Sequence, residues 1–284
     1  MAAIDYETEY NNRARVPDHP EIFARWTREA ELYRVEALEA GRAELGLSYG
    51  DTPRQSLDLF QPPLAVGETA PLALFIHGGW WRSLDISMFS QMARGFNRGG
   101  VAVAVVSYDL CPNVTIADIV EQLRRACAFL WQRLGRRMFA CGHSAGGHLA
   151  AAMVASDWPS FYPKAPPDLI PAGYAISGVF DLTPLPGISV NQDLRLTAEE
   201  AHQLSPLFWP VKPDRVFDAV VGGLESSEFK RQSRSLAEAW RQRGAQTRYE
   251  EIPGTNHFTV IDALADPSSA MTARVVALAR AVKG

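Results

Sequence analysis

The sequence is poor in cysteine, has no long apolar run and carries no excess of basic charge. Its three cysteines, Cys111, Cys127 and Cys141, stand far apart in apolar surroundings and form no CxxC or Cys/His pattern. We therefore expect reduced core thiols rather than a disulfide framework or a metal site. No apolar run reaches the ~20 residues that a membrane span needs, and the opening MAAIDYETEY is acidic where a signal peptide is basic and then apolar. These absences favour a cytoplasmic protein with no membrane association.

The charge of the chain also excludes a class of partners. The formal net charge is -4, and Lys and Arg are spread along the chain instead of forming a basic patch, so we expect no nucleic-acid partner. A chain of 284 residues with 47% hydrophobic residues can bury one large core. We expect a single domain over residues 1–284 that acts on a small molecule, and we leave its state open between a monomer and a homodimer.

Apolar periodicity divides the chain into an N-terminal arm and an alternating region. Apolar residues at helical intervals between about Asp18 and Gly46 predict one or two helices, so residues 1–50 form a helical arm that is either a lid or a packing element. Repeated strand and helix patterns after the arm imply an α/β fold with a mostly parallel sheet and helices on both faces. Strands are predicted at 55–60, 72–76, 101–108, 138–141, 173–177, 215–221 and 247–252, and helices at 87–98, 116–133 and 227–243.

A candidate nucleophile stands where one of these strands meets a helix. Gly142-His143-Ser144-Ala145-Gly146 fits G-x-S-x-G between the strand at 138–141 and an Ala-rich helix. In this motif the serine sits on a strained turn, and the small residues around it let strand and helix approach closely enough to expose the hydroxyl. The pattern in this context predicts the α/β-hydrolase fold, with Ser144 as nucleophile.

A serine needs a base, and His257 is the best candidate. It lies in a turn-rich loop directly after the strand at 247–252, so it can reach the carboxyl end of the sheet where Ser144 is expected. His143 is adjacent to the serine and cannot fold back onto it, and His148 lies within the following helix. The remaining candidates stand beside helices with no strand end near; they are His19 and His202.

The acid that orients this base should follow a strand between the serine and the histidine. Glu225 does so, after the strand at 215–221 and two glycines that permit a sharp turn. Asp181, after the preceding strand, is the main rival, and Glu228 is a weaker one. We assign Glu225 as the acid and keep both alternatives open.

The segment His77-Gly78-Gly79-Trp80-Trp81 is a candidate oxyanion loop, because this fold places its HGGG-type loop after the corresponding strand. The N–H groups of Gly78 and Gly79, together with the N–H of Ala145, would face the oxyanion that forms on attack. Trp80 stands in the place of the third glycine. We expect one of Trp80 and Trp81 to pack beneath the loop and the other to wall a substrate pocket, which favours an aromatic substrate.

With these residues in place, the sequence resembles the α/β-hydrolase kynurenine formamidases (arylformamidases), which cleave N-formyl-L-kynurenine to formate and kynurenine. The resemblance covers nearly the whole chain, and its motifs are EYNNR at 9–13, HGGWW at 77–81, SY at 107–108, CGHSAGGHLA at 141–150, SGVFDL at 177–182, LSP at 204–206, VGGLESSEF at 221–229, RQS at 231–233 and NHF at 256–258. It implies that Ser144 is the nucleophile, His257 the base, and the backbone of Gly78, Gly79 and Ala145 the oxyanion hole. Where the formamidases typically have D-S-P-E-F, this chain has Glu225-Ser226-Ser227-Glu228-Phe229.

We therefore expect a serine hydrolase without cofactor or metal that cleaves an N-formyl aryl amide through an acyl-enzyme. The substrate's charged groups would need partners, for which Arg13 and Arg82 are candidates. A carboxylesterase or thioesterase on the same scaffold is the alternative, because fold does not fix the substrate. A non-catalytic ligand-binding protein is a remote alternative, because serine, acid, histidine and oxyanion loop are all present.

Overall fold

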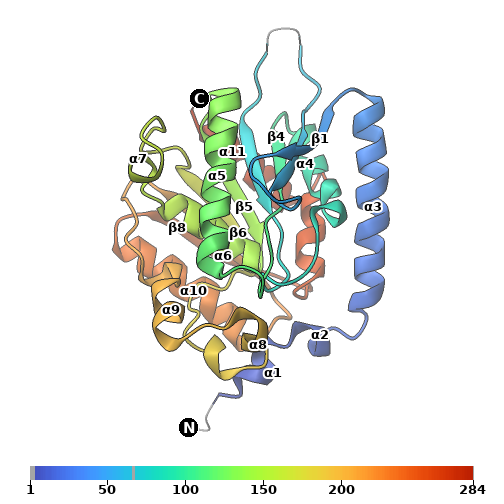
Figure 1. Ribbon diagram of the computed structural model, residues 1–284. Helices are drawn as coiled ribbons and strands as arrows, with labels where there is room; N and C mark the ends of the chain where they lie inside the picture. The colour runs from blue at the N-terminus through green and yellow to red at the C-terminus, as the bar shows by residue number, and fades with distance from the viewer. Residues whose placement is uncertain (1–3, 66–67, 284) are drawn as a thin grey trace.

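A computed structural model describes residues 4–65 and 68–283 of the chain. At its centre is an eight-stranded sheet with the order β1-β2-β4-β3-β5-β6-β7-β8 (Figure 1). The pairs β1/β2 and β2/β4 are antiparallel, and every other neighbouring pair is parallel. The strands are β1 (Ala43–Ser48), β2 (Ser56–Phe60), β3 (Leu72–Ile76), β4 (Ala102–Val106), β5 (Met138–His143), β6 (Ala172–Ile176), β7 (Val216–Gly222) and β8 (Gln246–Ile252).

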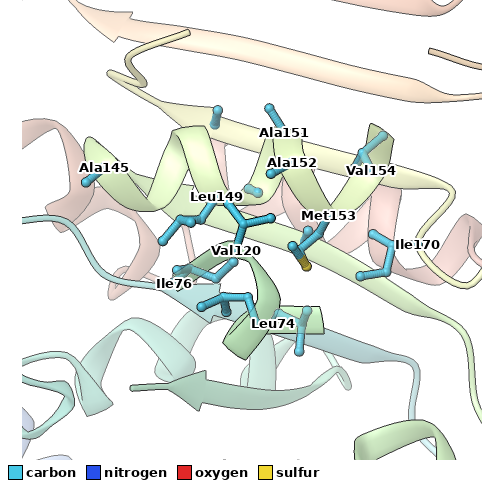
Figure 2. Packing of buried hydrophobic residues seen from close by; sticks show 14 of the residues in the cluster. Leu74, Ile76, Val120, Ala145, Leu149, Ala151, Ala152, Met153, Val154 and Ile170 are labelled. Carbon is cyan, nitrogen blue, oxygen red and sulfur yellow. The ribbon is translucent and has the colours of Figure 1, made fainter. Parts of the chain in front are cut away.

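Helices cover both faces of this sheet. The core on one face includes side chains of α5, α6 and α10, and the core on the other face includes side chains of α3, α4 and α11. Strands β3 and β4 are apolar throughout because both of their faces are covered, and every residue of LALFI in β3 and of AVAVV in β4 is buried. Figure 2 shows Leu149 of α6 next to Ile76 of β3 and Val120 of α5 in this core. The expected mostly parallel sheet with helices on both faces is confirmed.

The helices differ in length and in what they cover. The long helices α3 (His19–Glu39), α5 (Ile116–Leu134), α6 (Ala145–Ala155), α10 (Ser227–Gln242) and α11 (Ala270–Ala281) pack on the sheet, together with the short α4 (Ala93–Arg98). The remaining helical segments are α1 (Tyr6–Tyr10), α2 (Asn12–Arg15), α7 (Trp158–Phe161), α8 (Asn191–Leu194), α9 (Ala198–Gln203) and the 3-10 turns Ile86–Met88, Ser90–Met92, Leu185–Gly187, Pro206–Phe208 and Thr259–Leu264.

The N-terminal arm is not helical to its end, which corrects the prediction of helix up to Gly46. Helix α3 stops at Glu39, Gly41 follows with a φ of 64°, and residues 43–48 form the edge strand β1. Gly46, with a φ of 66°, lies at an irregularity in the pairing with β2, and its N–H donates to Asp58. A bulged edge strand with few buried side chains lacks a period-2 pattern, so its sequence resembled the end of a helix.

Two further expectations can be compared with the structure. Cys111, Cys127 and Cys141 are free and buried, as predicted. In the described part of the chain, no helix is long and apolar enough to cross a membrane.

Glycines allow α6 to cross close over the sheet at the end of β5. A Cβ atom on Gly146 would lie 1.9 Å from the carbonyl oxygen of Ile76, and one on Gly142 would lie 2.0 Å from the carbonyl oxygen of Gly146. Both contacts are with backbone, which cannot move aside without displacing β3 or α6. The junction between β5 and α6 therefore requires hydrogen at both positions.

We predict that Gly146→Ala lowers the free energy of unfolding by about 3 kcal/mol or more, because the added methyl group forces β3 and α6 apart. Gly187→Ala is the matched control, since Gly187 is exposed and its Cβ would meet nothing within 4 Å. Its effect should stay within about 0.5 kcal/mol. Urea unfolding of both variants measures the difference, and equal stabilities would contradict the close crossing.

Candidate active site

Ser144 lies on the turn between β5 and α6. Its φ of 55° and ψ of −119° are rare for a residue with a side chain, and such a conformation persists only when neighbouring structure holds it. Here the N–H of Ser144 donates to the carbonyl of Ile176 in β6 over 2.8 Å, and its own carbonyl accepts from the N–H of Gly147 over 2.8 Å. The hydroxyl of the candidate nucleophile is thereby presented above the carboxyl end of the sheet.

The structure brings His257 and Glu225 to this hydroxyl. His257 Nε2 lies 3.1 Å from Ser144 Oγ, and His257 Nδ1 lies 2.7 Å from Glu225 Oε2. A carboxylate oxygen accepts the Nδ1–H, so Nε2 is left as the acceptor for the serine hydroxyl. Serine, histidine and acid thus stand in the order and geometry that a general-base mechanism needs. All three are at least nine-tenths buried.

Glu225 is held by groups that sequence reasoning did not assign to the site. Its Oε1 accepts a hydrogen bond of 2.5 Å from Ser177 Oγ and one of 2.6 Å from the N–H of Gly222. Ser177 directly follows β6, the neighbour of β7, and its φ is 53°. In the sequence, Ser177 stands at the end of a predicted strand and begins the SGVFDL motif, but neither feature gave it a role in the site. With one oxygen fixed in this way, the other is aimed at His257.

The two alternative acids point elsewhere. Asp181 accepts from Thr183 and lies 3.2 Å from Arg231, and Glu228 accepts from Tyr10 and Arg231. Both carboxylates belong to a polar cluster between α10 and the N-terminal arm. Glu225 is the candidate acid that contacts the histidine.

Among the other histidines, His143 is close to the site. Its Nε2 donates to the backbone carbonyl of His257 over 2.8 Å, and the two rings lie 4.8 Å apart. Burial, followed by the nearby His257, lowers the pKa of His143 well below its usual value, so the ring is neutral. Sequence reasoning rejected His143 as the base, and the structure gives it a different place, holding the loop of His257.

The candidate oxyanion loop passes directly against the serine. A Cβ on Gly78 would lie 2.9 Å from the Ser144 Cβ, and Gly79 has a φ of 106° that glycine adopts readily. Neither the N–H of Gly78 nor that of Gly79 donates to any described residue, and Ala145 is the first residue of α6, where an N–H has no intrahelical partner. These three donors are therefore available beside the nucleophile.

His77 and Tyr108 hold the candidate oxyanion loop in place through stacking and hydrogen bonds. The His77 ring is fully buried and stacks on Tyr108, with ring centroids 4.5 Å apart. Tyr108 OH donates to the carbonyl of His77 over 2.8 Å, and His77 Nδ1 lies 2.7 Å from the carbonyl of Gly78. Burial lowers the pKa of His77 to about 4, so it packs as a neutral ring.

The adjacent tryptophans separate as expected. Trp81 is fully buried, with its ring 5.0 Å from His148, and does not line the pocket. Trp80 is half-buried and lines the pocket in front of Ser144, where its ring meets the edge of Tyr10. The substrate-binding assignment thus stays open for Trp80, while Trp81 lies beneath the loop.

The pocket above Ser144 is built largely by the N-terminal arm. It holds about 860 Å³ of space not occupied by protein atoms, part of it open to solvent. Besides His143, Ser144, His257 and Phe258, its walls come from the loop after β3, the segment 188–190 and the arm. The arm residues are Glu7, Tyr10, Asn11, Asn12, Arg13, Phe23 and Trp26.

The arm is bound firmly at this position. Glu9 accepts from Ser227 Oγ and from the N–H of Glu228, at the first turn of α10 that follows the acid loop. Farther along, Asp262 accepts from Trp26 over 2.9 Å and from Arg25 over 2.7 Å. These contacts join the arm to the loops that follow β7 and β8.

No group of three or more His, Cys, Asp or Glu side chains suited to a metal ion occurs among residues 4–65 and 68–283.

We predict that Glu225→Gln lowers kcat/KM by on the order of 10³-fold or more, because an amide in place of the carboxylate cannot hold the imidazole in the same tautomer or stabilise the imidazolium. Asp181→Asn is the matched control, and we expect its effect to stay below about tenfold. Steady-state kinetics on any turned-over substrate compares them. The reverse ranking would move the acid to Asp181.

Comparison with known proteins identifies the fold and the family. A family model described as the alpha/beta hydrolase fold matches residues 73–261. Kynurenine formamidase of Salmo salar is 32% identical over 230 residues, which are 78% of this chain and 77% of that protein. Kynurenine formamidase of Danio rerio is 30% identical over 254 residues, 84% of this chain and 85% of that protein.

A solved structure shares the architecture over almost the full length. It is a Silicibacter protein provisionally assigned as a thioesterase, with 35% identity and a TM-score of 0.84 over 96% of this chain and 99% of that one. The relatives confirm the expectation of a hydrolase rather than a binding protein. The chain belongs to the kynurenine formamidase family of α/β hydrolases.

Proposed function

We propose that this hydrolase cleaves an N-formyl aryl amide, N-formyl-L-kynurenine in particular, to formate and the free arylamine. The names of the fish relatives support the substrate, and the contacts of His257 with Ser144 and Glu225 support the chemistry. The hydrogen-bonded series Ser144-His257-Glu225 is the observation that carries the proposal.

In the proposed first step, His257 Nε2 takes the proton of the Ser144 hydroxyl as Oγ attacks the formyl carbon. The tetrahedral oxyanion is met by the N–H groups of Gly78, Gly79 and Ala145, and losing one such donor typically costs about 3 kcal/mol in the barrier. The imidazolium, stabilised by Glu225, then gives its proton to the nitrogen of the leaving arylamine as the C–N bond breaks.

The second step releases formate. Water loses a proton to His257 and attacks the formyl ester on Ser144, and His257 returns the proton to Oγ as the ester bond breaks. Over both steps, one water is consumed and one formate and one amine leave, so no oxidant, reductant or cofactor is needed. Cofactor independence stays a prediction, to be tested in the presence of a chelator.

The walls of the pocket suit an aromatic leaving group. Trp80 lines the pocket, and so do Phe23 and Phe258, which meet edge to face with ring centroids 5.0 Å apart. The backbone at Gly78 passes close to the serine, since a Cβ there would lie 2.9 Å from the Ser144 Cβ. The aromatic rings of the pocket favour an aryl group on the substrate, and a formyl group is the smallest acyl group that the site would have to accept.

A second candidate is a carboxylesterase or thioesterase. The Silicibacter protein, provisionally assigned as a thioesterase, has a higher identity to this chain than the two formamidases have. The proposed nucleophile and oxyanion donors would act equally on an ester carbonyl, so the kind of carbonyl must be tested directly.

We predict that the purified protein, assayed with a chelator, hydrolyses N-formyl-L-kynurenine with a kcat/KM of about 10⁴ M⁻¹s⁻¹ or above, within the ordinary enzymatic range. Ser144→Ala should remain folded and lose turnover. Short-chain p-nitrophenyl esters and acyl thioesters are measured beside the formamide. Activity confined to the esters or thioesters would contradict the formamidase proposal and favour the second candidate.

A further inference from the structure

The charged residues that line the pocket differ in whether they have an ionic partner. They are Glu7, Arg13 and Arg82. Arg82 pairs with Asp193, so its charge is already matched. Arg13 and Glu7, both on the N-terminal arm, form no ion pair with any described residue. The arm therefore presents one unmatched positive and one unmatched negative charge to the same pocket as Ser144.

Arg13 is held over an aromatic wall rather than by a carboxylate. Its guanidinium lies 5.9 Å from the centre of the Phe23 ring, and Phe23 in turn packs on Phe258, the neighbour of His257. A guanidinium in this position keeps its hydrogen-bond donors free, and its planar fork matches a carboxylate. The side chain is exposed, so an incoming ligand can reach it.

Glu7 is fixed against the segment 188–190, which also lines the pocket. Its two carboxylate oxygens accept hydrogen bonds of 2.7 Å from the N–H and the hydroxyl of Ser189. The hydrogen bond from the Ser189 side chain lowers the pKa of Glu7, so the carboxylate is ionised at neutral pH. Neutral donors hold its geometry without cancelling its charge, and the carboxylate stays available to a cation.

We propose that the N-terminal arm recognises the zwitterionic head of an α-amino acid substrate, with Arg13 binding its carboxylate and Glu7 binding its ammonium group. That the substrate with this head is an aryl formamide rests on the proposed function. The binding of an α-amino acid head by Arg13 and Glu7 does not. The arm is thus a specificity element, which explains why its anchoring to α10 and to Asp262 is so extensive. An uncharged aryl substrate would use the same reacting groups and gain nothing from the arm's two charges.

The test compares two aryl formamides that differ only in the amino-acid head. N-formyl-L-kynurenine carries it, and 2-formamidoacetophenone lacks it. The ratio of their kcat/KM values reports recognition of the head and cancels general effects on the reacting groups. Arg13→Gln and Glu7→Gln remove one charge each. Arg15→Gln is the matched control, because Arg15 lies on the same short helix, pairs with Glu9 and does not line the pocket.

We expect the wild type to prefer the head-bearing formamide, and Arg13→Gln and Glu7→Gln to lower the ratio at least tenfold, mainly through KM, since binding of a remote group acts equally on substrate and transition state. Arg15→Gln should leave the ratio within twofold. An unchanged ratio in Arg13→Gln and Glu7→Gln, or an equal loss in Arg15→Gln, would overturn the proposal.

Failure of the formamidase proposal can be distinguished from failure of the proposed head recognition. If the wild type hydrolyses esters and no formamide, the formamidase proposal fails, and the same ratio is taken from O-acetyl-L-tyrosine and 4-methylphenyl acetate. A preference for the tyrosine ester that falls in Arg13→Gln supports the recognition of the head. Absence of a preference in both substrate pairs overturns it.

Discussion

The strained backbone of Ser144 is the constraint around which the site is arranged. A positive φ at a residue with a side chain costs about 1–3 kcal/mol, and here the close crossing of α6 over β3 and the hydrogen bond to β6 offset that cost. Because β3, β5, β6, β7 and β8 are parallel, their carboxyl ends meet at one edge of the sheet (Figure 1). The oxyanion loop, the serine, Ser177, Glu225 and His257 each follow one of these ends, so short loops are enough to bring them together.

Buried polar groups hold the acid and the histidine of the proposed triad in place. Ser177 and the N–H of Gly222 hold Glu225, and the neutral His143 holds the backbone of His257. Polar groups are costly to bury without partners, and these hydrogen bonds offset part of that cost. The N-terminal arm is also connected to these groups. Its contacts with the first turn of α10 and with Asp262 join the pocket wall to the loops of Glu225 and His257. We infer that the arm is a fixed wall of the pocket more than a detachable cover.

Local patterns were sufficient to predict much of this molecule from sequence. Strand β3 and the helices α5 and α10 were predicted almost to the residue, since buried apolar runs and amphipathic helices leave clear periodicities. The order of Ser144, Glu225 and His257 along the chain was enough to predict the candidate site.

Features that depend on contacts between distant segments could not be predicted from the sequence. Asp181 and Glu225 both follow strands, and only the contacts of Ser177 and Arg231 decide which carboxylate faces His257. The edge strand β1 was missed for the same reason, and the arm stayed open between a lid and a packing element.

The central claim is that Ser144 is a nucleophile activated by His257. Its most direct test is reaction of the folded protein with an active-site-directed fluorophosphonate, followed by mass spectrometry of the intact chain and of its peptides. The account predicts one phosphonyl group per chain, on the peptide that contains Ser144, and little labelling when His257 is replaced by Ala. A fluorophosphonate that leaves Ser144 unmodified, or labels another serine at the same rate, would contradict it.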